Sequence, residues 1–282
     1  MQLRKIKFTK MQGISNDYIY INCFEESVEN PSDLAIKMSN RHTGVGSDGL
    51  VLIMPSESCD FRMRMFNSDG SEAEMCGNAS RCVGKFLYDK GLTKKKLISL
   101  ETLAGRKMLE LHTVNERVDT VTVDMGEPIF EASLILTTLN SSSVMKFPLQ
   151  VNSQTYSANC LSMGNPHCVL FMDEIDDLNL EKIGPLFESH PIFPKKTNTE
   201  FIKVLSEHSL RMRVWERGAG ETMACGTGAC ASVVTAVLNG YCDGKVIVSL
   251  RGGDLEIEWN RHDKHVYMTG AAVTVFEGTY EL

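Results

Sequence analysis

Two cysteines in this chain occur in segments whose residue types and spacing suit proton transfer. Cys76 begins a Cys-Gly-Asn segment and Cys225 begins a Cys-Gly-Thr segment, and a predicted helix follows each of them. The unpaired backbone N–H groups and the positive dipole end of a helix N-terminus favour a thiolate at that place. The same groups bind anions such as a substrate carboxylate. One cysteine in a tight turn is commonly structural, whereas two at matching positions indicate a functional pair.

An internal repeat relates the two cysteines. They are 149 residues apart, from 76 to 225, and the segment Arg62–Arg64 recurs as Arg211–Arg213 at the same offset. Further identical pairs at this offset are Gly77/Gly226, Glu72/Glu221, Gly91/Gly240 and Asn16/Asn165. Within positions 61–91 seven residues are identical without a gap, where chance gives about two. Shared strand or helix periodicity alone would not produce one constant offset, so we expect two related, pseudo-two-fold halves with the thiols on opposite walls of the cleft between them.

The residues around each cysteine predict the elements that position it. Before Cys76, the segment Phe61–Phe66 alternates apolar and charged side chains, as a half-buried strand does, and Leu210–Val214 repeats the pattern before Cys225. After each cysteine a helical run extends to a glycine fifteen residues further on, the expected C′ position. The second run is apolar on nearly every face, which is typical of a buried helix.

The remaining elements are predicted mostly as hairpin-like strands. Strands are expected near residues 50–54, 97–103, 108–114, 118–125, 246–250 and 255–259, with short helices near 32–40 and 178–189. The polar segment Thr137–Ser143 is the expected surface loop near the join. The predicted fold class is α/β (α+β), with two homologous domains that each wrap a mainly antiparallel sheet or barrel around a central helix. The predicted boundaries are 1–125 for the half with Cys76 and 126–270 for the half with Cys225.

Composition excludes several classes of function. The chain has 282 residues, a net charge of -7 and 43% hydrophobic residues, which is ordinary for a soluble globular protein. No stretch reaches the roughly 18 apolar residues that a membrane span needs, and the first residues do not resemble a secretory signal. The longest basic block is Lys94–Lys96. Neither a membrane nor a nucleic acid is therefore an expected partner.

The cysteine count favours a reducing compartment. Nine is an odd number, and a chain of this length buries its own core, so a disulfide scaffold is not expected. The patterns Cys-x-x-Cys and His-Glu-x-x-His are absent, which leaves a zinc site without support. We expect a cytoplasmic protein that binds no metal, in which the cysteines other than Cys76 and Cys225 are buried core residues.

Three other motifs contain residue types that can support chemistry, and one of them lacks the context that its function needs. The segment Gly44–Gly49 has the form G-x-G-x-x-G, but it precedes a predicted strand instead of following one and opening a helix, so it is not a dinucleotide site. Gly164–His167 is either a satisfied turn or part of the site. The charged pair within Trp215–Gly218 is either a salt-bridged strand end or part of the site.

Two opposed thiols suit inversion at the α-carbon of an amino acid. Removal of the α-proton leaves a planar carbanion, and protonation of its other face inverts the configuration. The reaction needs a base on one side and an acid on the other, which a thiolate and a thiol supply and exchange in the reverse direction. Helix N-termini directed at the carboxylate would stabilise the developing charge. The residues therefore predict an amino-acid racemase or epimerase that uses no cofactor.

Several segments resemble the diaminopimelate epimerase family. They occur in order between about residue 11 and residue 278, and they are long enough to be highly specific: Arg41–Gly49, Asn67–Asn78, Gly164–His167, Asn198–Phe201, Arg213–Cys230, Arg251–Asp254, Met268–Gly270 and Phe276–Gly278. The resemblance implies a PLP-independent isomerase that converts LL-2,6-diaminopimelate to the meso form, for lysine and peptidoglycan-precursor biosynthesis. It also implies a homodimer, and a last strand near 271–282 that completes the first domain.

The resemblance implies a role for each site residue, with Cys76 and Cys225 as the catalytic acid–base pair. The residues implied to bind substrate are Gly77, Asn78, Gly226 and Thr227 at the reacting carboxylate, Asn16, His167 and Glu216 around the reacting centre, and Asn67, Asn165, Asn198 and Arg217 at the distal amino-acid end. In the LL-to-meso direction it suggests Cys225 as proton acceptor and Cys76 as donor. The sequence leaves open which cysteine is the thiolate at rest.

One departure from the family pattern and two alternative functions complete the sequence-based interpretation. Ala79-Ser80 follows Asn78 where the family usually has glycine, which restricts the backbone but keeps the amides. A related racemase or epimerase could act on another amino acid, such as a proline. A thiol redox or metal-binding protein would instead use a Cys76–Cys225 disulfide or bound zinc.

Overall fold

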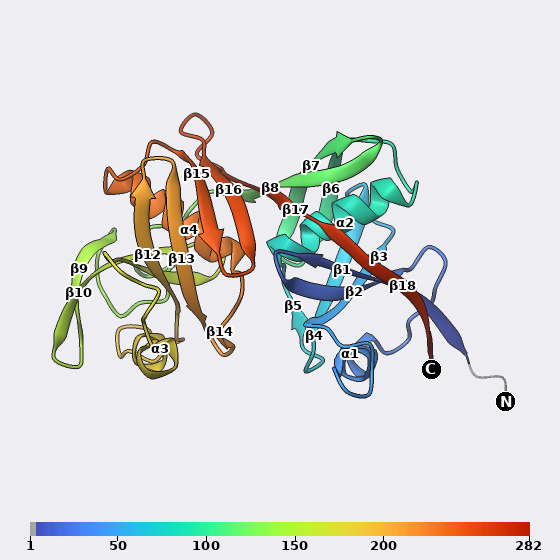
Figure 1. Cartoon of the computed structure of the whole chain (residues 1–282), viewed down its shortest axis with the longest axis horizontal. Coiled ribbons are helices and arrows are strands. Elements are labelled where there is room, and N and C mark those ends of the chain that lie inside the picture. Colours follow the sequence, from blue (N-terminus) through green and yellow to red (C-terminus); the bar gives the residue numbers. More distant parts are fainter. Residues whose placement is uncertain (1–3) are drawn as a thin grey trace. The chain divides into compact units, whose positions relative to one another are not determined.

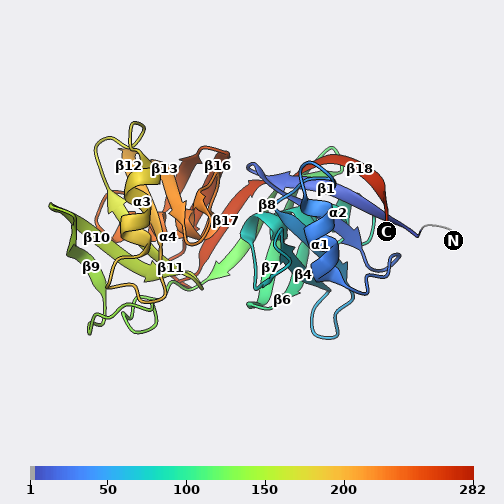
Figure 2. The ribbon, with the colours of Figure 1, turned by 90° about the horizontal axis from the view of Figure 1, so that it is seen from below.

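The computed structural model describes residues 4–282, which form two compact units. The first unit consists of the chain up to Asp124 together with Thr269–Leu282, and the second consists of Met125–Met268. Each unit contains two helices and a mainly antiparallel sheet, labelled in Figure 1 and seen from below in Figure 2. The mixed α/β class predicted from the sequence is confirmed.

The sequence repeat is also a repeat of secondary structure. Three pairs of elements have bounds that coincide after a shift of 149 residues: α1 (Pro31–Ser39) with α3 (Leu180–Glu188), α2 (Gly77–Asp89) with α4 (Gly226–Leu238), and β1 (Lys5–Gly13) with β10 (Gln154–Ser162). The structural match extends far beyond the few identical residues. Most positions in the repeat therefore keep their backbone while their side chains differ.

The other strands follow the same order in both units, with one exception. The first unit contains β2 (Asn16–Asn22), β3 (Gly49–Met54), β4 (Phe61–Asn67), β5 (Glu72–Ala73), β6 (Leu97–Thr102), β7 (Gly105–Val114), β8 (Arg117–Gly126) and β18 (Val273–Glu281). The second contains β9 (Val144–Val151), β11 (Pro166–Phe171), β12 (Asn198–Ser206), β13 (Ser209–Glu216), β14 (Gly220–Glu221), β15 (Lys245–Leu250), β16 (Gly253–Trp259) and β17 (Val266–Ala271). The exception is that β9 begins the second unit, while its counterpart β18 comes last in the first. β8 and β17 continue across the unit boundaries.

Strand pairing is the same in the two units. The pairs β2–β3 and β4–β6 are parallel in the first unit, and so are β11–β12 and β13–β15 in the second. The hairpin-like pairs β1–β2 and β3–β4 are antiparallel, as are β10–β11 and β12–β13. The C-terminal strand β18 pairs antiparallel with β1, in the way that β9 pairs with β10.

Each sheet packs around its second helix. The residues of α4 from Gly228 to Ala236 are all buried, and the helix contacts β10–β13, β15 and β16. In the first unit α2 contacts β1, β2, β7 and β18 (Figure 1). The small apolar side chains of α4 let strands approach it closely on several sides, so the expectation of a buried central helix is confirmed.

The ends of these helices agree with their sequence signals. α2 and α4 are followed by C-cap residues and then by Gly91 (φ 74°) and Gly240 (φ 78°), whose left-handed backbone favours glycine. The helices expected near 32–40 and 178–189 are α1 and α3. The Gly44–Gly49 segment leads into β3, which confirms that it is not a dinucleotide-binding turn. Among residues 4–282, none of the helices is both long enough and apolar enough to cross a membrane.

Candidate active site

Cys76 and Cys225 have the same local structure in their separate units. Each is the N-cap of a 13-residue helix: Cys76 precedes α2 with φ -138° and ψ 123°, and Cys225 precedes α4 with φ -127° and ψ 107°. We term the first-unit residues around Cys76 the Cys76 half-site, and the second-unit residues around Cys225 the Cys225 half-site. Each half-site is described within its own unit.

Backbone donors surround both thiols. The first helical hydrogen bond is donated by Ser80 in α2 and by Ala229 in α4, in each case to the carbonyl of the N-cap cysteine. The three backbone N–H groups that precede each donor make no hydrogen bond within the helix. They include the residues expected to bind carboxylate, Gly77-Asn78 and Gly226-Thr227. Each half-site can therefore bind an anion with backbone N–H groups and the helix dipole.

Asn16 organises the Cys76 half-site. The Cys76 thiol donates to Asn16 Oδ1 (3.4 Å), and Asn78 Nδ2 donates to the same oxygen (3.4 Å). Asn16 Nδ2 donates to Asp48 Oδ2 (2.8 Å), which fixes the end of the amide that faces the thiol. Asp48 in turn accepts from Arg41 (2.9 Å). The structure thus brings together three of the expected site residues.

A buried arginine supports this half-site. Arg81 has no exposed surface, and its Nη2 donates to Asn78 Oδ1 (2.9 Å) while its Nε donates to the carbonyl of Ala271 (3.3 Å). The Asn78 amide is therefore held at its oxygen by Arg81 and at its nitrogen by Asn16. Asn67 lies at the end of β4, where it bonds to the side chain (3.0 Å) and backbone (2.8 Å) of Ser71. These Asn67 contacts stay within the turn and do not join the Asn16 network.

Cys225 lies in a buried, acidic environment. It is 5% exposed, and its Sγ is 3.5 Å from the Thr227 hydroxyl. Burial raises the pKa of the Cys225 thiol well above its ordinary value, and the carboxylates of Glu216 and Glu200 raise it further. The Thr227 hydroxyl and the Gly228 N–H oppose this in part. The surroundings therefore favour the thiol form.

Glu216 ends β13 and accepts a hydrogen bond from the Thr222 hydroxyl across the β13–β14 turn. Burial raises the pKa of Glu216, and hydrogen bonds from Thr222 and Cys225 oppose the rise. The neighbouring Arg217 donates through Nη1 to the carbonyl of Lys195 (3.2 Å). Within the described part of the chain, Glu216 and Arg217 thus bond to other groups and do not form the salt-bridged strand end that the sequence allowed.

His167 lies at the start of β11 and is fully buried. Its Nδ1 is 2.7 Å from Glu200 Oε1, and its Nε2 is 2.9 Å from Asn165 Oδ1. β11 and β12 run parallel, and His167 pairs with Asn198. Glu200 lies two residues after Asn198 on β12. The turn that contains Asn165 and His167 is thereby tied to the Cys225 half-site, and His167 is more than a satisfied turn residue.

Asn198 and Glu188 hold the turn that carries Glu216 and Arg217. Asn198 Oδ1 accepts from the Arg217 N–H (2.9 Å), and its Nδ2 donates to the carbonyl of Pro166 (2.9 Å). Glu188, at the end of α3 and 6% exposed, accepts three hydrogen bonds. The donors are Trp215 Nε1 (2.7 Å), Lys196 Nζ (3.0 Å) and the Gly218 N–H (3.1 Å).

Four residues that hold the half-sites were not among the expected site residues: Asp48, Arg81, Glu188 and Glu200. Arg81 and Glu200 had no distinguishing sequence signal, because α2 also carries Lys85 and Asp89 and β12 also carries Lys203. Asp48 lies in a family-like segment but was not assigned a role there. Glu188 had no distinguishing sequence signal.

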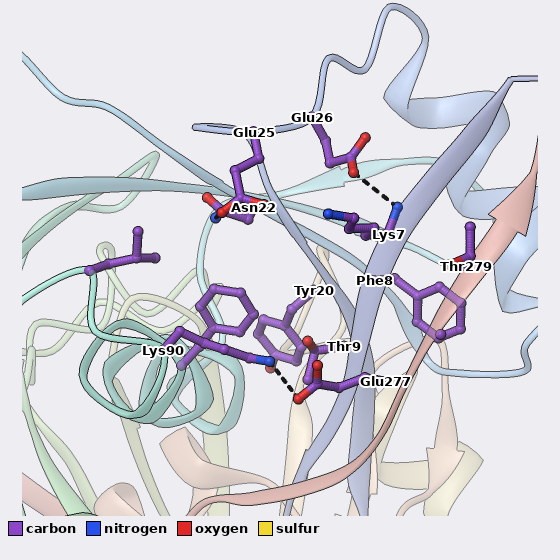
Figure 3. Close-up of a pocket in the computed structure, with 13 residues that line it drawn as sticks. Lys7, Phe8, Thr9, Tyr20, Asn22, Glu25, Glu26, Lys90, Glu277 and Thr279 are labelled. Carbon is purple, nitrogen blue, oxygen red and sulfur yellow. Dashed lines mark hydrogen bonds and ion pairs between the residues drawn. The ribbon is translucent and has the colours of Figure 1, made fainter.

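A cavity of about 490 Å³ lies elsewhere in the first unit, between β1, β2, β18 and the end of α2 (Figure 3). Two of its acidic side chains already have partners: Glu277 pairs with Lys90, and Glu26 accepts from the backbone N–H of Lys7 (3.2 Å). None of the expected site residues lines it. In residues 4–282 there is also no group of three or more His, Cys, Asp or Glu side chains placed to hold a metal ion.

Comparison with known proteins identifies a family. A family model described as "Diaminopimelate epimerase" matches residues 8–131 and 159–275. A protein named diaminopimelate epimerase from Acetivibrio thermocellus is 58% identical over 277 residues, which cover 98% of this chain and 99% of that one. One of the same name from Desulfovibrio desulfuricans is 57% identical, covering 98% of each chain. One from Methanococcus maripaludis is 55% identical, covering 98% of this chain and 100% of that one.

Solved structures with low sequence identity share the fold. A PhzF-family phenazine biosynthesis protein from Bacillus anthracis has a TM-score of 0.71 at 16% identity, covering 99% of this chain and 100% of that one. A hydroxyproline epimerase from Agrobacterium vitis has a TM-score of 0.70 at 13% identity, covering 100% and 93%. At these identities the likeness concerns the fold alone.

Proposed function

The chain belongs to the diaminopimelate epimerase family, and we propose that it converts LL-2,6-diaminopimelate to the meso isomer without a cofactor, with Cys76 and Cys225 as the acid–base pair. One observation carries the proposal. Both cysteines are N-caps of equivalent helices, at positions 149 residues apart, and each has backbone N–H groups beside its thiol. The meso product would serve lysine and peptidoglycan-precursor synthesis.

In the proposed reaction one cysteine, as a thiolate, takes the α-proton, and the electron pair remains on the α-carbon and its carboxylate. The other cysteine, as a thiol, gives its proton to the opposite face, so the thiol and thiolate have exchanged places at the end. The N–H groups at Gly77-Asn78 and Gly226-Thr227 would stabilise the carboxylate as it gains charge. Asn16, His167 and Glu216 would surround this centre.

The distal amino-acid end would be bound by a second set of polar groups: Asn67, Asn165, Asn198 and Arg217. Three of the four lie in one region of the second unit, because Asn198 accepts from the backbone N–H of Arg217 and donates to the carbonyl of Pro166, next to Asn165. An arginine at this place suits the distal carboxylate, since a guanidinium can bind both of its oxygens. The Asn67 assignment rests on the family resemblance alone.

Location and assembly follow from the same proposal. None of the nine cysteines is in a disulfide in the structure, which agrees with a reducing compartment such as the cytoplasm. A homodimer is proposed from the family resemblance. The exposed apolar side chains of Val273, Val275 and Phe276 on β18 are compatible with burial against a second copy. Sedimentation of the purified chain would measure its mass in solution.

The activity is tested by incubating the purified chain with LL-diaminopimelate in D₂O. We expect meso product with deuterium at the inverted α-carbon, without added cofactor. Much faster α-hydrogen exchange on proline or another amino acid would instead support the related racemase. Alkylation of both thiols should abolish turnover of a protein that carries no metal. Stoichiometric zinc, or activity that depends on a disulfide, would contradict the proposal.

A further inference from the structure

Glu200 is a buried carboxylate without a known role in this site. It lies in β12 with no exposed surface, and its Oε1 is 2.7 Å from Nδ1 of the equally buried His167. Among the described residues, its second oxygen, Oε2, has no hydrogen-bond partner. A carboxyl group buried in this way costs free energy unless it is hydrogen-bonded or paired. His167 is the group that contacts it.

Both ring nitrogens of His167 face oxygen acceptors. Nδ1 faces Glu200, and Nε2 faces Asn165 Oδ1 at 2.9 Å with the amide placed as in the structure. These two contacts fix the plane and direction of the His167 ring. An imidazole that donates from both nitrogens is the cation.

The carboxylate lies under the first turn of α4, next to the proposed catalytic thiol. A Cβ atom added to Gly228 would be only 2.6 Å from Glu200 Oε1, so this turn packs directly on the carboxylate. The titratable groups facing it are His167 and Cys168 of β11, Glu216 of β13 and Cys225 at the N-cap of α4. The negative charge of Glu200 raises the pKa of Cys168, Glu216 and Cys225.

The first unit has no equivalent of this arrangement. At the offset of 149 residues, Glu200 corresponds to Val51, His167 to Tyr18, and Gly228 to Ala79. In the first unit, valine replaces the carboxylate, and alanine replaces the glycine that lies beside it. The Glu200–His167 contact therefore belongs to the Cys225 half-site alone and is not required by the fold.

We propose that Glu200 is a positioning residue for the reaction, which holds His167 as an oriented cation under the first turn of the helix that Cys225 caps. The inference rests on the proposed function, in which Cys225 is one of the acid–base pair. Glu200 acts through His167 and Cys225 and need not touch the substrate.

The first test is Glu200→Gln, which keeps an oxygen that can accept from His167 but removes the charge. Iodoacetamide alkylation of each cysteine is followed by peptide mass spectrometry between pH 6 and 11. We expect the Cys225 profile to move down by about one pH unit, or about tenfold faster labelling on its rising limb, with Cys76 unchanged. The acidic limb of the kcat/KM profile should move with it, and kcat should fall about tenfold while KM changes less than about threefold.

Two further variants separate this role from a structural one. Thr199→Val changes a buried residue next to Glu200 on the same strand and should leave both profiles as in the wild type. Glu200→Asp keeps the charge and should return the Cys225 profile toward that of the wild type. A folded Glu200→Gln variant with wild-type labelling and pH–rate profiles would overturn the proposal.

A wild-type measurement keeps the test independent of variant folding. In ¹⁵N-histidine-labelled protein, both ring nitrogens of His167 should carry protons at neutral pH. A neutral ring with one N–H would overturn the proposal even if no variant at position 200 folds. Labelling and NMR do not require activity, so wild-type protein that fails to epimerise diaminopimelate counts against the proposed function. Active wild-type protein with a neutral His167 counts against Glu200 alone.

Discussion

The first turns of α2 and α4 have the same backbone and different electrostatic surroundings. Cys76 is partly exposed and donates to the uncharged Asn16 amide, whereas Cys225 is buried near two carboxylates. The buried ionisable group beneath the first half-site is Arg81, and beneath the second Glu200 contacts His167. The thiols of Cys76 and Cys225 therefore differ in acid strength although their backbone geometry is the same. The side chains behind each helix set the proton affinity of its thiol.

This contrast bears on the resting state of the proposed pair. The raised pKa of Cys225 indicates that this cysteine holds its proton in the free protein. If Cys225 is the proton acceptor in the LL-to-meso direction, as the family resemblance suggests, substrate binding must then change its surroundings. The substrate ammonium group would lower the pKa of the Cys225 thiol, whereas displacement of water would raise it.

The largest expected effect is the loss of either cysteine. Cys76→Ser and Cys225→Ser should each lower kcat by at least about 100-fold, because a hydroxyl is a far weaker acid than a thiol and transfers the proton poorly. Deuterium incorporation into LL-diaminopimelate measures both variants. Cys59→Ser, which changes a partly exposed cysteine outside both half-sites, should remain active. Near-normal turnover in either active-site variant would end the two-base mechanism.

Exchanging charges between the half-sites should exchange their thiol reactivity. Glu216→Gln removes a carboxylate that raises the pKa of Cys225, so its alkylation at pH 8 should become about tenfold faster. Asn67 is the equivalent residue of the first unit, and Asn67→Glu should slow alkylation of Cys76. Peptide mass spectrometry gives both rates in one experiment. If the two cysteines respond alike to both variants, their environments do not differ as described.

The anchor of the Arg217 turn should show its own pH dependence. Burial alone would raise the pKa of Glu188, but hydrogen bonds from Trp215, Lys196 and the Gly218 N–H bring it below its ordinary value. A carboxyl with a lowered folded-state pKa stabilises the protein above its unfolded pKa, and this stabilisation is lost as the pH falls through the folded value.

Glu188→Gln should therefore destabilise the protein by about 1–3 kcal/mol at pH 7, and the difference from wild type should shrink as the pH falls below about 4.5. Urea unfolding at pH 7 and pH 4 measures both values, and KM should rise because the turn carries Arg217. The first-unit equivalent is the buried Ser39, whose change to alanine should show no such pH dependence. A difference that is the same at both pH values would contradict the ionic role of Glu188.

The last contrast concerns an ion pair that occurs in both units. Arg64–Glu72 (2.7 Å) and Arg213–Glu221 (2.9 Å) are equivalent, but the first pair is 30% and 29% exposed and the second only 11% and 13%. Arg213 also donates to three backbone carbonyls. Arg213→Ala should cost about 2–3 kcal/mol in unfolding free energy and Arg64→Ala less than about 1 kcal/mol. Equal losses would show that burial does not distinguish the pairs.

The repeated parts of the fold could be predicted from the sequence because they leave local signals. The strand alternation before each cysteine and the glycines at 91 and 240 gave α2, α4, β4 and β13 with small errors at their ends. The pairing of β18 with β1 could not be derived in this way, because no local pattern links strands about 270 residues apart. The family resemblance alone suggested it.

The differences between the half-sites were hidden for the opposite reason. A search for identities at one offset finds what the halves share, while Glu200 and Arg81 correspond to Val51 and Cys230. Their importance lies in contacts to residues on other elements, such as the 2.7 Å contact between Glu200 and His167. The thiols were therefore visible in the sequence, and the groups that set their proton affinity were not.

The pairing of β18 with β1 also sets an order for biosynthesis. The second unit is a continuous stretch and can complete its sheet once residue 268 has left the ribosome, whereas the first unit still lacks the strand that pairs with β1. Domains commonly mature from the N-terminus during translation, and here the N-terminal unit has to finish last. Until then β1 presents an open edge to the cell, where a chaperone or another nascent chain can pair with it.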